Sequence, residues 1–258
     1  MSHACTDVAV DHVIFYAGQA LDDLADFFVS VGFQLTPLGR HNSGSVNRLA
    51  MLQGQYIELM GFEPGTPTSV RPEIQSMAPG LNGIVATDPA GRVRRRQADH
   101  FLPGVHLERP VDAPGVQGVA SFTITRVTDG PADVRTFMCR HHTPGLVWRD
   151  EWQLHANGAL SIAGVWLATR HPRQLHESLQ ILFDIDGEAD PTAYDAAGTL
   201  VGVVGEHQRA SIVVRTQSIE PVTSLLRRAE VQHRQQGRRV EVPLPQPYAA
   251  DLVFEAAA

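Results

Sequence analysis

Four stretches of the chain share one order of apolar and polar positions. Each begins with a short, partly β-branched apolar run, continues through a turn, and ends in a stretch with apolar residues at helical spacing. The four stretches start at His12, Gly83, Gly164 and Ser211. Because half-buried strands favour β-branched residues, each stretch predicts a strand followed by a helix.

The helical part of the first stretch has a clear apolar stripe. Its positions i, i+3, i+4 and i+7 are Leu21, Leu24, Ala25 and Phe28. The fourth stretch repeats this spacing, and the third keeps one stripe with Leu175, Leu179 and Leu182, which predicts helices that lie on a sheet. The second stretch is different, because its helical part carries the basic run Arg92, Arg94, Arg95 and Arg96. We expect that run to form a solvated helix face.

Further strand-like segments follow each helix. Residues 46–53 and 55–62 are separated by a turn at Gly54, which predicts a hairpin. The simplest interpretation is an α+β fold of four βαβββ-like units. Either the units differ in the length of their loops, or the third unit is truncated. Residues 63–72 and 102–118 are rich in Pro and Gly and predict loops. Hairpin-linked strands after each helix disfavour a doubly wound parallel sheet.

Composition narrows the class of protein. With 43% hydrophobic and 19% charged residues, the 258-residue chain is globular. Its net charge of -7 disfavours a nucleic-acid footprint, and no apolar run approaches the roughly 18 residues of a membrane span. The start of the chain lacks signal-peptide features, and the two cysteines, Cys5 and Cys139, predict a reduced, cytoplasmic protein. Twelve histidines are a first indication of metal or acid–base chemistry.

Several short motifs in this order resemble a known family. They are residues 11–13 (DHV), 32–33 (GF), 41–47 (HNSGSVN), 55–59 (QYIEL), 142–148 (HTPGLVW) and 155–158 (HANG). Together they resemble the glyoxalase-like domain family of the vicinal oxygen chelate superfamily, which includes glyoxalase I, extradiol dioxygenases and bleomycin-resistance proteins. The resemblance implies paired βαβββ modules that form incompletely closed, mainly antiparallel barrels with the helices outside.

The resemblance also implies a divalent metal ion inside the barrel. In that superfamily, one ligand lies near the start of a module's first strand and a Glu lies on its last strand. His12 and Glu58 match these two positions, and Glu58 could also serve as the catalytic base. The other three units carry Gly83, Gly164 and Ser211 at the position of His12, so we expect one metal site at most.

Strand alternation is consistent with a contact between His12 and Glu58. Side chains alternate along a strand, so Val13 and Phe15 would face the helix while His12 faces the barrel interior. A Glu among large apolar residues is costly to bury without a cation partner. The alternative is a Glu58 on a solvent-facing strand side and a core histidine with a backbone partner.

A third metal ligand is expected from His141 or His142, at the end of a strand in the second unit. Because neighbouring side chains point to opposite faces, only one of them should ligate, and we favour His142, which opens the HTPG motif. Two His and one carboxylate with open positions suit Fe, Mn, Ni or Zn. The alternative is a polar strand exit followed by an ordinary turn.

Two groups of residues are candidates for substrate binding. His41, Asn47 and Arg48 lie beside the Gly44 loop and could orient a substrate oxygen or carboxylate, although the same residues fit an ordinary hairpin loop. Trp148, with Trp152 and His155 nearby, could line a pocket for an apolar substrate, although aromatic residues on strands are often plain core.

The predicted organisation is two module pairs, residues 1–158 with the metal site and residues 159–258 with degenerate modules. The predicted function is a metal-dependent enzyme that chelates a small oxygenated substrate through two neighbouring oxygens, with isomerase, lyase or dioxygenase chemistry. The alternatives are a metal-free small-molecule binding or resistance protein and a catalytically inactive paralogue. A small-molecule substrate and a homodimer are the expected partners, without nucleic acid or membrane.

Overall fold

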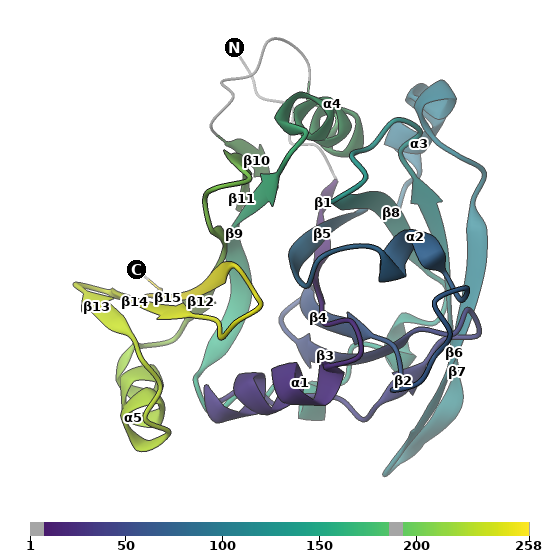
Figure 1. Ribbon diagram of the computed structural model, residues 1–258. Coiled ribbons are helices and arrows are strands. Elements are labelled where there is room, and N and C mark those ends of the chain that lie inside the picture. The colour runs from purple at the N-terminus through teal and green to yellow at the C-terminus, as the bar shows by residue number, and fades with distance from the viewer. Residues whose placement is uncertain (1–7, 186–192, 258) are drawn as a thin grey trace.

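A computed structural model describes residues 8–185 and 193–257 of the chain. Within these residues the strands form two sheets that lie side by side, with helices against their outer faces (Figure 1). No helix in the described ranges is long and apolar enough to cross a membrane. The predicted α+β fold is confirmed.

The first sheet has eight strands. In spatial order they are β2 (Gly39–Arg40), β3 (Val46–Met51), β4 (Tyr56–Gly61), β1 (Ala9–Tyr16), β5 (Gly80–Thr87), β8 (Arg135–His141), β7 (Val116–Arg126) and β6 (Val105–Ala113). β1 pairs in parallel with β4, β5 pairs in parallel with β8, and the antiparallel β1–β5 pair joins the two units. Each half is therefore one βαβββ module, as predicted.

This first sheet curls into a nearly closed barrel. Its two edge strands approach each other, and the backbone N–H of Asn42 donates a hydrogen bond of 3.2 Å to the carbonyl of Glu108 on β6. The short helix α2 (Pro72–Gln75) covers the barrel, because its Ile74 joins the apolar cluster of Tyr16, Met60 and Phe137 inside. Closure gives the barrel an interior that is separate from the outer core.

The second sheet has seven described strands. In spatial order they are β10 (Tyr194–Ala196), β11 (Thr199–Gly205), β9 (Ala159–Thr169), β12 (Ala210–Thr216), β15 (Ala250–Ala256), β14 (Arg239–Pro243) and β13 (Arg234–Gln236). The fourth module is a complete βαβββ unit, whereas two described strands, β10 and β11, follow the helix of the third. The edge strands β10 and β13 lie apart, so this sheet stays open (Figure 1).

The main helices bury the apolar stripes that the sequence predicts. These helices are α1 (Leu21–Ser30), α4 (Pro172–Phe183) and α5 (Glu220–Arg228). Their buried residues join one apolar core with residues from both sheets, and the ring of Phe33 stacks on that of Phe254 with centroids 5.8 Å apart. This shared core fixes the second sheet against the outer face of the barrel.

The basic run forms the short helix α3 (Arg92–Arg96), in which Val93 alone is buried, so its arginines form the solvated face that we expect; a 3-10 turn follows. One predicted segment differs from the structure. Residues 102–118, predicted as a loop, contain strand β6 and the start of β7. The strand tolerates Pro110 because β6 is the edge of the sheet, where a missing N–H costs no ladder bond.

Candidate functional site

A β-bulge on β1 brings two neighbouring side chains into the barrel. The pairing of β1 with β5 shifts between Val10, opposite Ala86, and His12, opposite Val85, so Asp11 is the additional residue. Because a bulge interrupts strand alternation, Asp11 and His12 are both buried, at 2% and 3% exposure. His12 Nδ1 lies 2.6 Å from Asp11 Oδ1, a short charge-assisted hydrogen bond.

Glu58 faces the other nitrogen of the same imidazole. The parallel register of β1 and β4 places Tyr56 opposite His12 and Glu58 two residues further on. The His12 ring stacks on Tyr56 with centroids 4.2 Å apart, and its Nε2 lies 3.6 Å from Glu58 Oε2. Asn47, on β3, donates a hydrogen bond of 2.7 Å from Nδ2 to Glu58 Oε1. Oxygen Oε1 of the Glu58 carboxylate is thus fixed by Asn47, while Oε2 faces His12.

Both carboxyl groups are ionised despite their burial. Burial raises the pKa of Asp11, but its hydrogen bonds to His12 and His141 outweigh burial and lower the pKa to about 2. Burial likewise raises the pKa of Glu58, but the attraction of His12 and His41 together with the Asn47 hydrogen bond brings it below its usual value. The site therefore has two fixed negative charges beside one imidazole.

Strand β8 contributes one face of side chains to the interior. The residues that share this face and line the cavity are Arg135, Phe137, Cys139 and His141. His142 follows β8 on the opposite side, where it is exposed and its Nε2 lies 2.8 Å from Thr123 Oγ1. The structure therefore brings His141, and not the favoured His142, to His12 and Glu58, because strand alternation turns His142 outward.

A second group of ligand atoms lies on the far side of Asp11. One atom each of Asp11, Cys139 and His141 lies within 4.8 Å of the others. His141 Nε2 is 3.2 Å from Asp11 Oδ1 and 3.4 Å from Cys139 Sγ. Burial raises the pKa of the Cys139 thiol well above its usual value, which favours the protonated sulfur. Cys5 lies outside the described residues.

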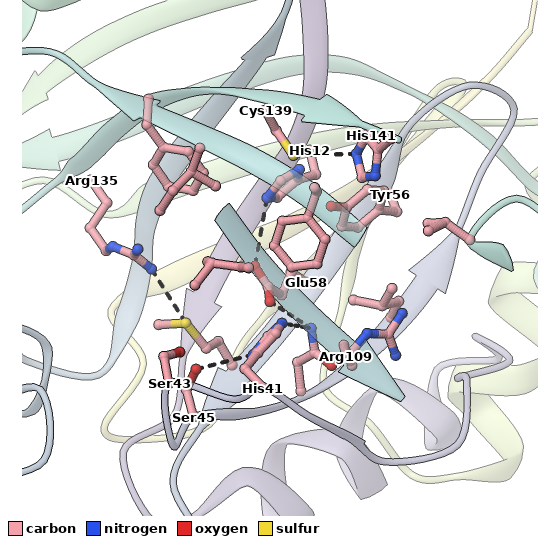
Figure 2. Close-up of a pocket in the computed structure, with 18 of the residues that line it drawn as sticks. His12, His41, Ser43, Ser45, Tyr56, Glu58, Arg109, Arg135, Cys139 and His141 are labelled. Atoms are coloured by element: carbon pink, nitrogen blue, oxygen red, sulfur yellow. Dashed lines mark hydrogen bonds and ion pairs between the residues drawn. The ribbon is translucent and has the colours of Figure 1, made fainter. Parts of the chain in front are cut away.

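These side chains surround one cavity in the barrel (Figure 2). Its volume of about 50 Å³ has room for only a few water-sized groups. His41 lies on the wall below Glu58, with its Nδ1 3.1 Å from Ser45 Oγ. Burial lowers the pKa of His41 to about 4, so its imidazole is neutral near pH 7. The cavity accordingly combines charged, neutral polar and apolar walls.

The other predicted site residues lie at different distances from this cavity. Asn47 and His41 line it. Arg48 lies on the opposite face of β3, with its Nη2 3.7 Å from Asp22 Oδ1 of α1. Trp148 packs edge-on against His141, with ring centroids 4.7 Å apart, behind the cavity wall.

Several residues in or near the cavity had no predicted role. Those with a charged or metal-binding side chain beside the candidate ligands include Asp11, Arg109, Arg135 and Cys139. Asp11 enters through a bulge, which depends on pairing with β5 and leaves no local pattern. Arg109 lies on β6, where Leu107, Arg109 and Val111 share the inward face, in a segment that the Pro and Gly content predicts as a loop.

Comparisons with known proteins give the family and the fold. Residues 10–183 match the glyoxalase-like domain family. A search of curated proteins finds no match. A hypothetical protein from Staphylococcus aureus has a TM-score of 0.63 at 15% identity, with 97% of this chain and 100% of that chain covered.

Two further solved structures share the fold. A fusion of a xylose isomerase-like TIM barrel with 4-hydroxyphenylpyruvate dioxygenase has a TM-score of 0.58 at 12% identity; 99% of this chain spans 51% of that one. A mutant 4-hydroxymandelate synthase from Streptomyces coelicolor has a TM-score of 0.54 at 9% identity, covering 97% and 94% of the two chains. The match covers more than half of the chain and shows that this chain belongs to the glyoxalase-like domain family, in agreement with the repeated modules and the barrel.

Proposed function

We propose that this chain is a metal-dependent enzyme of the vicinal oxygen chelate type, with a divalent first-row transition metal ion held by His12 and Glu58. The supporting observation is the 3.6 Å between His12 Nε2 and Glu58 Oε2. That distance is too long for a hydrogen bond, and it leaves room for an ion that both atoms would ligate. Nitrogen and carboxylate oxygen form the donor set that such ions take.

The surrounding residues support these two ligands. Asp11 accepts the Nδ1 proton of His12, which leaves the Nε2 lone pair directed at the cavity. Asn47 fixes one oxygen of Glu58 and leaves the other free of hydrogen bonds within the described chain. In contrast, Asp11 and His141 of the second group are already bonded to each other, so we place the ion between His12 and Glu58.

When bound, the ion would act as a Lewis acid toward two neighbouring oxygens of a small substrate. Glu58 is ionised and faces the cavity, so we assign it the acceptance of a substrate proton at its carboxylate. Apolar walls formed by Leu49, Phe122 and Phe137 exclude water from this proton transfer. Isomerase, lyase and dioxygenase reactions share this chelation of the substrate, and chelation is the step that we propose for this chain.

Metal titration tests the proposal. Chelator-treated protein, purified without an affinity-column metal, is titrated with Mn²⁺, Fe²⁺, Ni²⁺ and Zn²⁺ by calorimetry, with elemental analysis of the loaded protein. We expect about one ion per chain and at least a 100-fold loss of affinity in His12→Ala and Glu58→Gln. His142→Ala, which changes a histidine outside the cavity, is the matched control and should bind as the parent does.

Circular dichroism verifies that each variant is folded. Cys139→Ser tests the location of the ion: a large loss of binding there, with Glu58→Gln unaffected, would assign the ion to the Asp11, Cys139 and His141 group instead. If none of the four metals binds to the folded parent protein, the metal-free binding protein becomes the better assignment.

A further inference from the structure

Arg109 is a buried arginine with no carboxylate within ion-pair distance in the part of the chain that the structure describes. It lies on β6 between the inward residues Leu107 and Val111 and is only 5% exposed. Its side chain lines the cavity, and Figure 2 shows Arg109 and Arg135 on either side of Glu58. Within the described residues, no hydrogen bond or ion pair holds its guanidinium.

A buried guanidinium without a partner is costly. Burial lowers the pKa of Arg109, yet an arginine in a protein stays protonated. The charge therefore remains in the barrel, and charged groups are seldom buried unless a counter-ion or ligand compensates them. An anion that enters from solution would provide that compensation.

The surrounding backbone leaves space for this side chain. A Cβ atom on Gly39 would lie 2.5 Å from both Cδ and Nη1 of Arg109 and 2.4 Å from Asn47 Oδ1. Asn47 Oδ1 is itself buried without a hydrogen-bond partner. The side chains of Asn47 on β3 and Arg109 on β6 thus meet over Gly39. The Asn47 amide oxygen and the Arg109 guanidinium remain available to a ligand there.

Arginines outnumber carboxylates among the residues that line the cavity. Three guanidinium groups line it, those of Arg71, Arg109 and Arg135, with the carboxylate of Glu58. The Asp11 carboxylate lies behind the lining and is bonded to His12 and His141. Arg71 is paired with Glu73, with Nε 3.2 Å from Oε1. Arg135 has only soft contacts, a 3.3 Å approach of Nη1 to Met60 Sδ and the Phe137 ring 5.1 Å below its guanidinium. Arg109 and Arg135 therefore line the cavity without an ion-pair partner among the described residues.

We infer that the substrate of this cavity is a small organic acid whose carboxylate binds Arg109. The planar fork of an arginine matches the two oxygens of a carboxylate. The cavity of about 50 Å³ restricts the acid to a few heavy atoms unless side chains move. The inference deepens the proposed function, on which it rests for the position of the acid beside His12 and Glu58.

Binding to metal-free protein tests this inference separately from the metal. Chelator-treated full-length protein is titrated by calorimetry with oxalate and pyruvate, and with oxamide as a neutral analogue of the same shape. We expect oxalate or pyruvate to bind and oxamide not to bind. Arg109→Met should weaken acid binding about 10- to 100-fold, since a hydrogen-bonded charge pair is lost. Arg228→Met, at an exposed arginine of α5, is the matched control and should change nothing.

Two further readouts separate the outcomes. Without ligand, Arg109→Met should melt at the same temperature as the parent or higher, because it removes an uncompensated buried charge. A titration with Mn²⁺ on the same variant should give the parent affinity. If none of Mn²⁺, Fe²⁺, Ni²⁺ and Zn²⁺ binds to either protein while acid binding still depends on Arg109, the proposed function fails and this inference stands. Acid binding that is indifferent to Arg109→Met, or inorganic phosphate that binds more tightly than both acids, overturns it.

Discussion

The two sheets of this protein are built from the same kind of unit but differ in closure and in chemistry. In the first sheet, β2 and β6 meet and enclose the polar cavity. In the second sheet, β10 and β13 stay apart, and one face of β9, β12 and β15 packs on the shared core. Repetition of the module thus supplies a scaffold twice, and closure of the sheet creates an interior once.

Strand register shows what the other modules have in place of the two candidate ligands. His12 lies opposite Tyr56, and Glu58 is two residues further on. In each of the other three modules, we take the residue at the position of His12 and the residue two places beyond its register partner. These pairs are Gly83 with Phe137, Gly164 with Gly202, and Ser211 with Val253. None of these three pairs offers an imidazole and a carboxylate. The comparison teaches that the fold tolerates loss of the ligands, so the chemistry is not needed to build the module.

The largest expected effect concerns the core that joins the sheets. Phe254→Ala removes a fully buried ring that stacks on Phe33, and should lower the free energy of unfolding by about 3–5 kcal/mol. Val253→Ala, the next residue on the opposite face of β15, is the control and should cost about 1 kcal/mol or less. Urea unfolding monitored by circular dichroism measures both. Equal losses of unfolding free energy in the two variants would mean that the Phe33–Phe254 contact does not hold the second sheet to the barrel.

Introducing the two candidate ligands into the open sheet tests whether metal binding needs the closed barrel as well as the two residue types. Ser211→His combined with Val253→Glu places the two ligands at the corresponding register positions of the open sheet. In a His12→Ala background, we expect Mn²⁺ affinity at least 100-fold below that of the native site. The residue before Ser211 is Ala210, so no counterpart of Asp11 orients the new imidazole. Calorimetry measures the difference, and parent-like affinity would show that the open sheet suffices.

Gly39 tests the closed edge of the first sheet. Gly39→Ala places a methyl group against Arg109 and Asn47, so we expect a loss of about 1–3 kcal/mol in the free energy of unfolding and weaker acid binding. Gly145→Ala has open space around the new methyl group and is the control. Thermal melts and the oxalate titration measure both effects. An unchanged Gly39→Ala protein would mean that the two edge strands separate without cost.

Acid should destabilise the protein through two half-buried histidines, His41 and His155. Burial lowers the pKa of His41 from 6.5 to about 4, and burial also lowers the pKa of His155 from 6.5 despite the hydrogen bond that its Nε2 donates to the Met51 carbonyl. Below pH 6.5 the unfolded chain therefore binds protons that the folded chain does not bind, so stability falls as the pH drops toward about 4.

His155→Gln assigns part of that dependence to the junction of the two sheets. The amide of Gln can still donate to Met51 but cannot titrate, so we expect a smaller loss of stability between pH 7.5 and pH 5 than in the parent. Urea unfolding at the two pH values gives the comparison, and His41 should account for what remains. A pH dependence identical to that of the parent would exclude His155 as a contributor.

Much of the fold could be predicted because its signals are local. The stripe of Leu21, Leu24 and Phe28 and the hairpin turn at Gly54 are periodicities within a few residues. Strand β6 was missed because Pro110 and the exposed polar positions of an edge strand read as a loop. Its inward residues Leu107, Arg109 and Val111 are too few to outweigh those signals.

The site was harder to predict, as the choice between His141 and His142 shows. Both faces of β8 are apolar: Met138 packs in the core between the sheets, whereas Phe137 and Cys139 pack inside the barrel. The hydrophobic pattern therefore does not show which face is the interior. Only the pairing with β5 and β7 places His141 inside and His142 outside.

The sequence by itself determined the repeated modules, the amphipathic helices and the resemblance that pointed to His12 and Glu58. Only the tertiary structure decided that Asp11 supports His12, that Arg109 stands unpaired in the cavity, and that one sheet closes while the other stays open. The physical reason is range: helix and strand periods arise between near neighbours. A bulge, a strand register and a closed edge instead depend on partners far away along the chain.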